Sequence, residues 1–211
     1  MHYPSGDGFL EDFQTRLLKV PPASFDVECG DHILNPGVPP YVFWEGEPRQ
    51  AAVLVPIVQG AAEPEVILTL RTTRLSSHGG QIAFPGGKVD PGDPDPMHTA
   101  IREAEEEIGL AREYVRPLRS MGPYLTGSGF RVTPVVTIVA SGFELKANPD
   151  EVDEIFSVPL SFLMDPFNHR IGSRPWNGKE RFFYEIPYGE RYIWGVTAGI
   201  IRAIYETIYG D

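Results

Sequence analysis

The glutamates near the middle of the chain have the residue type and the spacing to hold a metal ion. Asp95 is a favourable N-cap residue and Gly109 suits the position just past a helix end, so the segment between them predicts a helix. At roughly 100° per residue, Glu103, Glu106 and Glu107 fall on one face of this helix. Carboxylates this close repel one another unless a cation offsets the repulsion, and Mg²⁺ or Mn²⁺ would also bridge to phosphate oxygens. The sequence therefore predicts a divalent metal site on an acidic helix face.

The other side of the same helix is apolar and is expected to pack against the core. Its stripe consists of Met97, Ile101, Ala104 and Ile108. Arg102 lies off the carboxylate face, where a guanidinium could brace neighbouring acids or loop carbonyls. The alternative interpretation of the glutamates is a solvated acidic helix face that binds nothing.

The residues around this helix also resemble a known signature. Gly87, together with residues 102–110, REAEEEIGL, resembles the signature of the Nudix hydrolases, which reads G, five residues, E, seven residues and REUxEExGU, with U a bulky aliphatic residue. The chain departs from this signature in three places. Asp93 stands where the first Glu is expected, eight residues instead of seven separate it from Arg102, and Ala104 is small for a U position. The half of the signature that carries the metal ligands is otherwise complete.

The resemblance implies roles for the residues of this helix. Glu103 and Glu107 would be the main metal ligands, and Glu106 would be a further ligand or the group that polarises the attacking water. Gly87 is expected to offer its backbone carbonyl to the metal, because glycine lets the main chain come close to a ligand. Arg102 is expected to take part in catalysis together with these glutamates.

The segment before the glycine turn resembles one subgroup of that family. Coenzyme A pyrophosphatases carry LLTxR[SA], three residues, R, three residues, G, three residues and FPGG. This chain has residues 67–72, ILTLRT, and residues 80–87, GQIAFPGG, at the same spacing. The departures are Ile67, Thr72 and Ser76, and Ser76 stands where the subgroup has arginine. The resemblance implies hydrolysis of coenzyme A or its thioesters to 3′,5′-ADP and 4′-phosphopantetheine or its acyl form.

Two arginines and the glycine turn are the candidates for substrate contacts. Arg71 ends an expected strand and Arg74 follows it, and arginine binds phosphate oxygens in a bidentate manner. Phe84 and Gly86 belong to the turn and are expected to contact the substrate as well. The alternative for either arginine is an exposed side chain without a role.

A loop outside the helix is expected to supply one more carboxylate. Residues 148–159, NPDEVDEIFSVP, contain Glu151 and Glu154, and Nudix enzymes often take a further base or ligand from such a loop. The alternative, which the sequence alone favours, is a solvated acidic loop.

Three aromatic residues near the C-terminus are candidates for stacking on an adenine. Tyr184, Tyr192 and Trp194 lie in an expected late hairpin. Aromatic residues at such spacing more often belong to the core, which is the alternative for all three.

Strands and helices are expected to surround this site. We expect helices over residues 9–20, 96–108, 159–164 and 196–209, and strands over residues 50–58, 65–71, 116–125, 131–140, 181–187 and 191–194. Residues 1–48, a helix and a Pro/Gly-rich connector, are expected to pack on a domain of residues 49–211. This alternation is compatible with the α/β (α+β) architecture that the resemblance implies, an α/β/α sandwich with a mixed curved sheet between helices.

Composition limits the partners and the location of the protein. The chain has 211 residues, 42% of them hydrophobic, which suffices for one sizeable core. Its net charge of −11 argues against nonspecific nucleic-acid binding, so a small nucleotide is the expected partner. The single cysteine, Cys29, excludes an internal disulfide, and no apolar run suits a membrane span or a signal peptide. We therefore expect a soluble, cytoplasmic protein, either monomeric or a homodimer.

Two other functions are open from the sequence. ADP-ribose or an NADH-like dinucleotide is the alternative substrate, because Ser76 replaces an arginine of the subgroup. A Nudix-fold module that binds a nucleotide without cleaving it is the second alternative, and the complete set of glutamates argues against it. The residue order in the loop before the helix excludes an EF-hand, and no Ser-His-Asp arrangement is visible.

Overall fold

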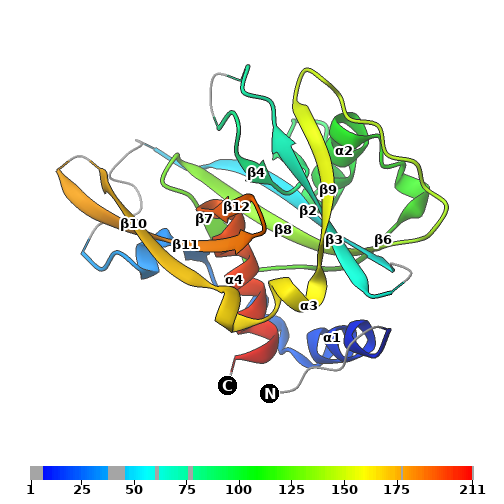
Figure 1. Ribbon diagram of the computed structural model, residues 1–211, viewed down its shortest axis with the longest axis horizontal. Coiled ribbons are helices and arrows are strands. Elements are labelled where there is room, and N and C mark those ends of the chain that lie inside the picture. Colours follow the sequence, from blue (N-terminus) through cyan, green and yellow to red (C-terminus); the bar gives the residue numbers. More distant parts are fainter. Residues whose placement is uncertain (1–6, 38–45, 60–61, 76–77, 177, 211) are drawn as a thin grey trace.

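A mixed sheet forms the centre of the molecule. The computed structural model describes the chain except residues 1–6, 38–45, 60–61, 76–77, 177 and 211. The strands of this sheet are β1 (Cys29–Gly30), β2 (Arg49–Gln59), β3 (Pro64–Arg71), β4 (Ile82–Ala83), β5 (Gly86–Lys88), β6 (Val115–Ser120), β7 (Tyr124–Leu125), β8 (Phe130–Val139) and β9 (Val152–Pro159). They follow the order β1-β7-β8-β2-β3-β4, with β5 paired to β2, β6 to β8 and β9 to β3 (Figure 1).

The pairing of β2 opens the sheet at one end. β2 runs parallel to β8 and antiparallel to β3, but its pairing with β3 covers only residues 57–59. Further back along the same strand, residues 51–53 pair with β5. Because β4 pairs with the far end of β3, the turn from β4 to β5 crosses between the diverging strands β2 and β3. This turn contains the glycines of the expected site.

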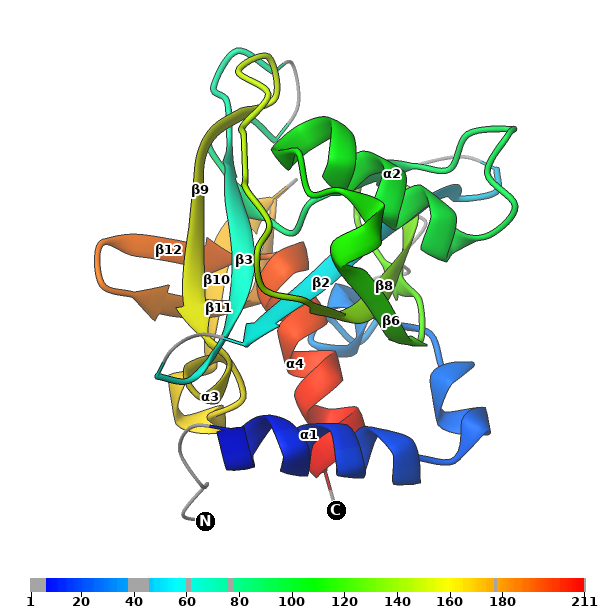
Figure 2. The same ribbon diagram turned by 90° about the vertical axis from the view of Figure 1, so that its right-hand side faces the viewer.

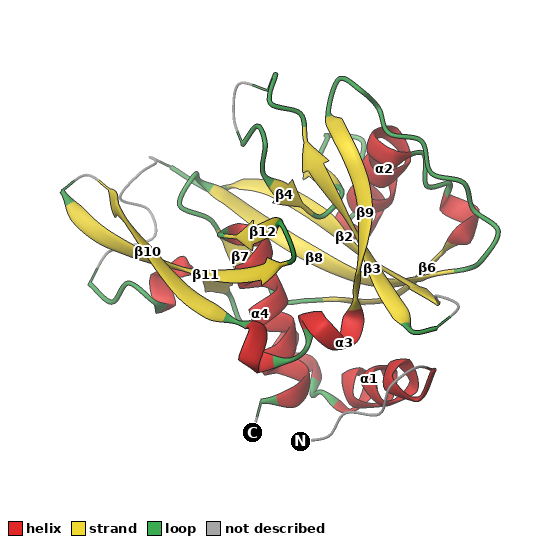
Figure 3. Ribbon diagram, viewed as in Figure 1, coloured by secondary structure: helices red, strands yellow, loops and turns green. Residues whose placement is uncertain are grey.

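The described part of the chain also contains four α-helices and four short 3₁₀ helices, which are coloured red in Figure 3. The α-helices are α1 (Asp7–Lys19), α2 (Pro96–Ile108), α3 (Leu160–Leu163) and α4 (Val196–Tyr209). The 3₁₀ helices are η1 (Pro22–Phe25), η2 (Asp31–Ile33), η4 (Arg112–Tyr114) and η5 (Pro166–Asn168). None of the described helices is both long and apolar enough to cross a membrane.

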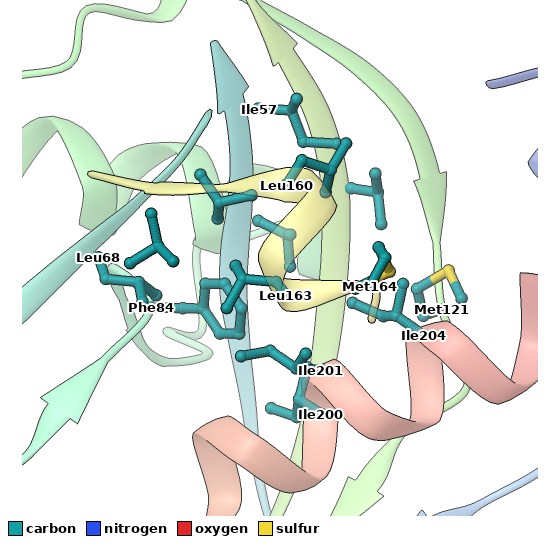
Figure 4. Close-up of a cluster of buried hydrophobic side chains, with 14 of the residues drawn as sticks. Ile57, Leu68, Phe84, Met121, Leu160, Leu163, Met164, Ile200, Ile201 and Ile204 are labelled. Atoms are coloured by element: carbon teal, nitrogen blue, oxygen red, sulfur yellow. The ribbon is translucent and has the colours of Figure 1, made fainter. Parts of the chain in front are cut away.

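The helices cover both faces of the central sheet (Figure 2). On one face, the buried side of α2 packs against Leu54, Ile67 and Val135. On the other face, α1, α3 and α4 pack against Ile57 and Leu68 in a larger cluster, part of which Figure 4 shows. These layers confirm the expected α/β/α sandwich with a mixed sheet.

A small second sheet lies beside the central one. It consists of β10 (Arg170–Trp176), β11 (Lys179–Tyr188) and β12 (Arg191–Trp194), all antiparallel. The late hairpin expected over residues 181–194 is confirmed, and Gly189 adopts a φ of 58° in its turn. β10 was not expected, because a glycine and a proline within its seven residues weaken the strand pattern.

Other expected elements are confirmed with two corrections. Residues 148–159, expected as a loop, contain β9, which pairs with β3 along its length. The acidic residues of β9 hide its strand character, and pairing with a buried strand outweighs this weak propensity. The strand expected over residues 116–125 is divided into β6 and β7.

The N-terminal segment shares the core of the rest of the chain. Phe9, Leu10 and Phe13 of α1 are buried in the same cluster as α4. In the connector that follows, β1 pairs in parallel with β7, a contact that the sequence pattern did not indicate. The division into residues 1–48 and 49–211 stays a prediction.

Candidate active site

Local sequence determines where the acidic helix α2 begins and ends. The Asp95 side chain accepts a hydrogen bond from the His98 N–H at 2.9 Å and caps the N-terminus. Gly109 ends the helix with a φ of 68°, and its N–H donates to the carbonyls of Ala104 and Glu105. The predicted apolar stripe packs into the core. The rotation of α2, and with it the direction of each glutamate, follows from this packing.

Glu107 lies inside the molecule. Only 1% of its side chain is exposed. Its Oε1 accepts a hydrogen bond from Arg71 Nη1 at 3.0 Å, and its Oε2 accepts one from the Gly86 N–H at 3.0 Å. Burial raises the pKa of Glu107 to about 7, although Arg71 and the Gly86 N–H act to lower it. The expectation that all three carboxylates share one presented face is thus wrong for Glu107, which faces the sheet.

Arg102 connects the acidic loop to the helix. Its Nη1 lies 3.0 Å from Glu103 Oε1 and 3.1 Å from Glu106 Oε2. Its Nε and Nη2 donate to the two carboxylate oxygens of Asp93 at 3.2 and 3.0 Å. Nη2 also donates to the Lys88 carbonyl at 3.2 Å. One guanidinium therefore orients two carboxylates of the helix and holds the preceding loop.

Asp93 has a role that the sequence interpretation did not assign. In addition to Arg102, it accepts a hydrogen bond from Thr99 Oγ1 at 2.9 Å. The hydrogen bond with Arg102 is the main reason that the pKa of Asp93 is lowered. An aspartate is one methylene shorter than the glutamate of the signature, and the loop here is one residue longer. We infer that the extra loop residue lets the shorter side chain of Asp93 reach Arg102. The aspartate and the longer loop were the features of the sequence that could have indicated this role.

Glu103 lies against the glycine turn. Its side chain is 16% exposed, and a Cβ atom added at Gly87 would lie 2.4 Å from Glu103 Cδ. Glycine at position 87 therefore leaves the space that this carboxylate occupies. Burial raises the pKa of Glu103, Arg102 acts to lower it, and the charges of Glu106 and Glu151 raise it further.

Replacing Gly87 by alanine is expected to lower turnover at least roughly tenfold, because the added methyl group displaces the Glu103 carboxylate. The melting temperature should change little, since the displaced group is the end of a flexible side chain. Steady-state kinetics and a thermal melt measure the two effects. Gly92→Ala is the matched control, because no atom lies within 4 Å of a Cβ placed there. Unchanged turnover in Gly87→Ala would contradict the position of Glu103 described above.

The remaining candidates for substrate contacts lie in different environments. Arg74 is exposed, and its Nε donates to Thr72 Oγ1 at 3.3 Å while its Nη2 donates to the Pro149 carbonyl. Phe84 is only 3% exposed and packs in the core (Figure 4). Its side chain shapes the turn, and we correct the expectation that it contacts a substrate. Ser76, which replaces the subgroup's arginine, lies outside the described residues.

The two candidate carboxylates outside the helix have different neighbours. Glu151 acts to raise the pKa values of both Glu103 and Glu107, so it lies within electrostatic reach of them. Glu154 pairs with Arg191 of β12 at 2.7 Å, on the sheet face that α4 covers. Of the two, Glu151 is therefore the better candidate for a base or a ligand.

The donor set at α2 suits a hard divalent cation. The carboxylates of Glu103, Glu106 and Glu107 and the Gly87 carbonyl are all oxygen donors, as Mg²⁺ prefers. Burial is the main reason that the pKa values of Glu103 and Glu107 are raised despite their arginine partners, and a bound cation would favour the charged form of both carboxylates. Within the described ranges, however, no three His, Cys, Asp or Glu side chains are arranged as a complete metal site.

Comparisons with known proteins give matches over much of this chain. A family model described as "NUDIX domain" matches residues 48–177. "Uncharacterized Nudix hydrolase NudL" of Photorhabdus laumondii is 39% identical over 160 residues, which are 76% of this chain and 85% of the relative. The protein of the same name from Yersinia pestis is 38% identical over 160 residues, 76% of this chain and 80% of the relative. The crystal structure of a NUDIX hydrolase from Alicyclobacillus acidocaldarius has 20% sequence identity and a TM-score of 0.50, and the match covers 77% of this chain and 93% of that one.

Proposed function

The chain belongs to the Nudix hydrolase family, and we propose that its substrate is coenzyme A or a coenzyme A thioester. Hydrolysis of the pyrophosphate bond would release 3′,5′-ADP and 4′-phosphopantetheine or its acyl form. The support for this substrate is the segment of residues 67–87, which resembles the coenzyme A pyrophosphatases at the same spacing.

One observation carries this proposal: the two sequence motifs meet at Glu107. Arg71 comes from the upstream segment, Gly86 from the glycine turn and Glu107 from the acidic helix. Both bonds to Glu107 measure 3.0 Å. The segment that resembles the subgroup therefore contributes directly to the carboxylate cluster that resembles the whole family. This contact supports the proposal that the segment takes part in substrate recognition.

A divalent ion, Mg²⁺ or Mn²⁺, is proposed to bind at Glu103, Glu106, Glu107 and the Gly87 carbonyl. When bound, such an ion supplies positive charge for the diphosphate and lowers the pKa of a water ligand. Arg102 keeps Glu103 and Glu106 oriented in this scheme, through the ion pairs at 3.0 and 3.1 Å.

Two arginines are proposed to bind the phosphates. A guanidinium has five N–H donors, and the bond to Glu107 uses one, so Arg71 can hold Glu107 and a phosphate oxygen together. Arg74 is the second candidate. The oxygen of a water forms a bond to one phosphorus while the bridging P–O bond breaks, and Glu106 or Glu151 accepts the proton of that water.

Product analysis tests the proposed substrate. Purified protein is incubated with Mg²⁺ or Mn²⁺ and, in separate reactions, with coenzyme A, acetyl-coenzyme A, ADP-ribose and NADH, and the products are identified by mass. We expect the highest kcat/KM for coenzyme A or its thioester, with release of 3′,5′-ADP and loss of turnover in EDTA. In ¹⁸O-labelled water, the product that gains the label identifies the phosphorus that is attacked.

Other outcomes would change the substrate. A higher kcat/KM for ADP-ribose or NADH would replace coenzyme A and keep the metal-dependent hydrolysis. No turnover of any of the four compounds would contradict the proposed substrate and favour a different nucleotide, either cleaved or only bound.

A further inference from the structure

The small sheet lies against the segment that leads into the active site. β12 contacts β4, as Figure 1 shows, and Thr197 Oγ1, at the start of α4, donates to the Ile82 carbonyl at 2.9 Å. From β4 the chain continues through Phe84 to Gly86, whose N–H holds Glu107. A ligand that extends from the phosphate site across β4 would therefore meet β12.

The two faces of the small sheet have different surroundings. Ile193 and its cross-strand partner on β11 are 0% exposed and belong to the core that α4 shares. Tyr184 lies on this same face, where Arg202 of α4 stands over its ring at 5.6 Å. Tyr192 and Trp194 alternate with Ile193 along the strand and so point to the other face. Of the three aromatic residues considered for stacking, Tyr184 is therefore part of the packing against α4.

Arg174, Trp194 and Tyr192 form a continuous stack on that other face. Arg174 Cζ lies 4.8 Å from the centroid of the Trp194 ring, and the Tyr192 ring lies 6.3 Å from Trp194 at an interplanar angle of 22°. The Tyr192 hydroxyl donates a hydrogen bond to Glu185, which fixes the ring. Tyr192 is nevertheless 45% exposed. The end of the stack is thus an oriented aromatic ring that solvent can reach.

We propose that Tyr192, supported by Trp194, is the platform on which the adenine base of the substrate stacks. A purine base offers a flat π-face, and an oriented aromatic ring binds such a face without needing a particular hydrogen-bond pattern. The strand that carries this ring, β12, contacts β4, and β4 leads into the turn whose Gly86 N–H binds Glu107. The inference rests on the proposed function in one respect, that the substrate is an adenine nucleotide.

The test measures ligand binding without turnover. Wild type, Tyr192→Leu and Tyr192→Phe are titrated by calorimetry with 3′,5′-ADP and with 4′-phosphopantetheine, which has a phosphate but no base. We expect Tyr192→Leu to bind 3′,5′-ADP about tenfold more weakly than wild type, with binding of 4′-phosphopantetheine unchanged. Tyr192→Phe should bind like wild type, because it keeps the ring. Phe167→Leu is the matched control, since Phe167 is an 88% exposed aromatic residue on η5.

Kinetics give a second readout and separate the two proposals. For coenzyme A, Tyr192→Leu should raise KM about tenfold and leave kcat unchanged. Equal binding of 3′,5′-ADP by wild type and Tyr192→Leu would overturn the platform, and so would a wild type that binds no adenine nucleotide. An equal loss of 4′-phosphopantetheine binding would overturn it as well, since the effect would not depend on the base. If 3′,5′-ADP binds through Tyr192 but coenzyme A is not cleaved, the platform is supported and only the proposed substrate fails.

Discussion

Replacing Glu106 by glutamine is expected to lower kcat at least about a hundredfold, as for loss of a group that moves a proton or positions the reacting water. Glu106 is 56% exposed and lies 3.1 Å from Arg102. Glutamine keeps its size and loses only the negative charge. Because an exposed ion pair contributes at most about 1 kcal/mol, the cooperative unfolding transition should stay close to that of wild type. Turnover and urea unfolding measure the two quantities on the same preparation.

The matched control for this variant is Glu105→Gln. Glu105 is an exposed neighbour on α2, so the same change of charge should leave kcat near the wild-type value. A titration with Mg²⁺ separates the two roles of Glu106: a lost ligand weakens metal binding, whereas a lost base leaves metal binding intact. Near-normal turnover in Glu106→Gln, with an unchanged melt, would remove Glu106 from the mechanism.

The sequence predicts the acidic helix well and its buried carboxylate poorly. Asp95 and Gly109 act on residues within one turn of themselves, so the ends of α2 can be derived from local chemistry. The environment of Glu107 depends on Arg71, 36 residues away, and on Gly86, 21 residues away. A helical wheel places the three glutamates near one another but does not show which of them the sheet covers. Only the packing of the apolar stripe decides that.

The same distinction explains the errors in the predicted strands. β2, β3 and β8 carry apolar residues that strand propensity detects directly. β9 is acidic and β10 contains glycine and proline, so each is a strand mainly because its partner, β3 or β11, offers a backbone to pair with. Pairing between segments far apart in the chain is not visible in a short window of sequence. Glu154 was therefore expected on a loop, whereas its place on β9 directs it to Arg191 and away from α2.

Replacing Arg71 by methionine is expected to lower the free energy of unfolding of the metal-free protein by about 3 kcal/mol near pH 8. The variant leaves the Glu107 carboxylate, which is 1% exposed, without the guanidinium that lies 3.0 Å from it. Methionine keeps much of the apolar stem of arginine, so the loss reports mainly on the charge. Arg74→Met is the control, because Arg74 is exposed and its replacement should change stability little. Urea unfolding measures both variants.

The effect of Arg71→Met should depend on pH in a defined direction. The folded-state pKa of Glu107 is about 7, above its ordinary value of 4.5, so the folded protein binds this proton more tightly than the unfolded chain. The resulting contribution to stability is fully present below the ordinary pKa and is lost as the pH rises through about 7. At about pH 5, Glu107 is protonated in the folded wild type and in folded Arg71→Met, so it needs no positively charged partner. The difference in the free energy of unfolding between the two proteins should therefore be small. An equal loss of stability at both pH values would mean that Arg71 stabilises the fold by packing, and that the charge of Glu107 is balanced by other groups.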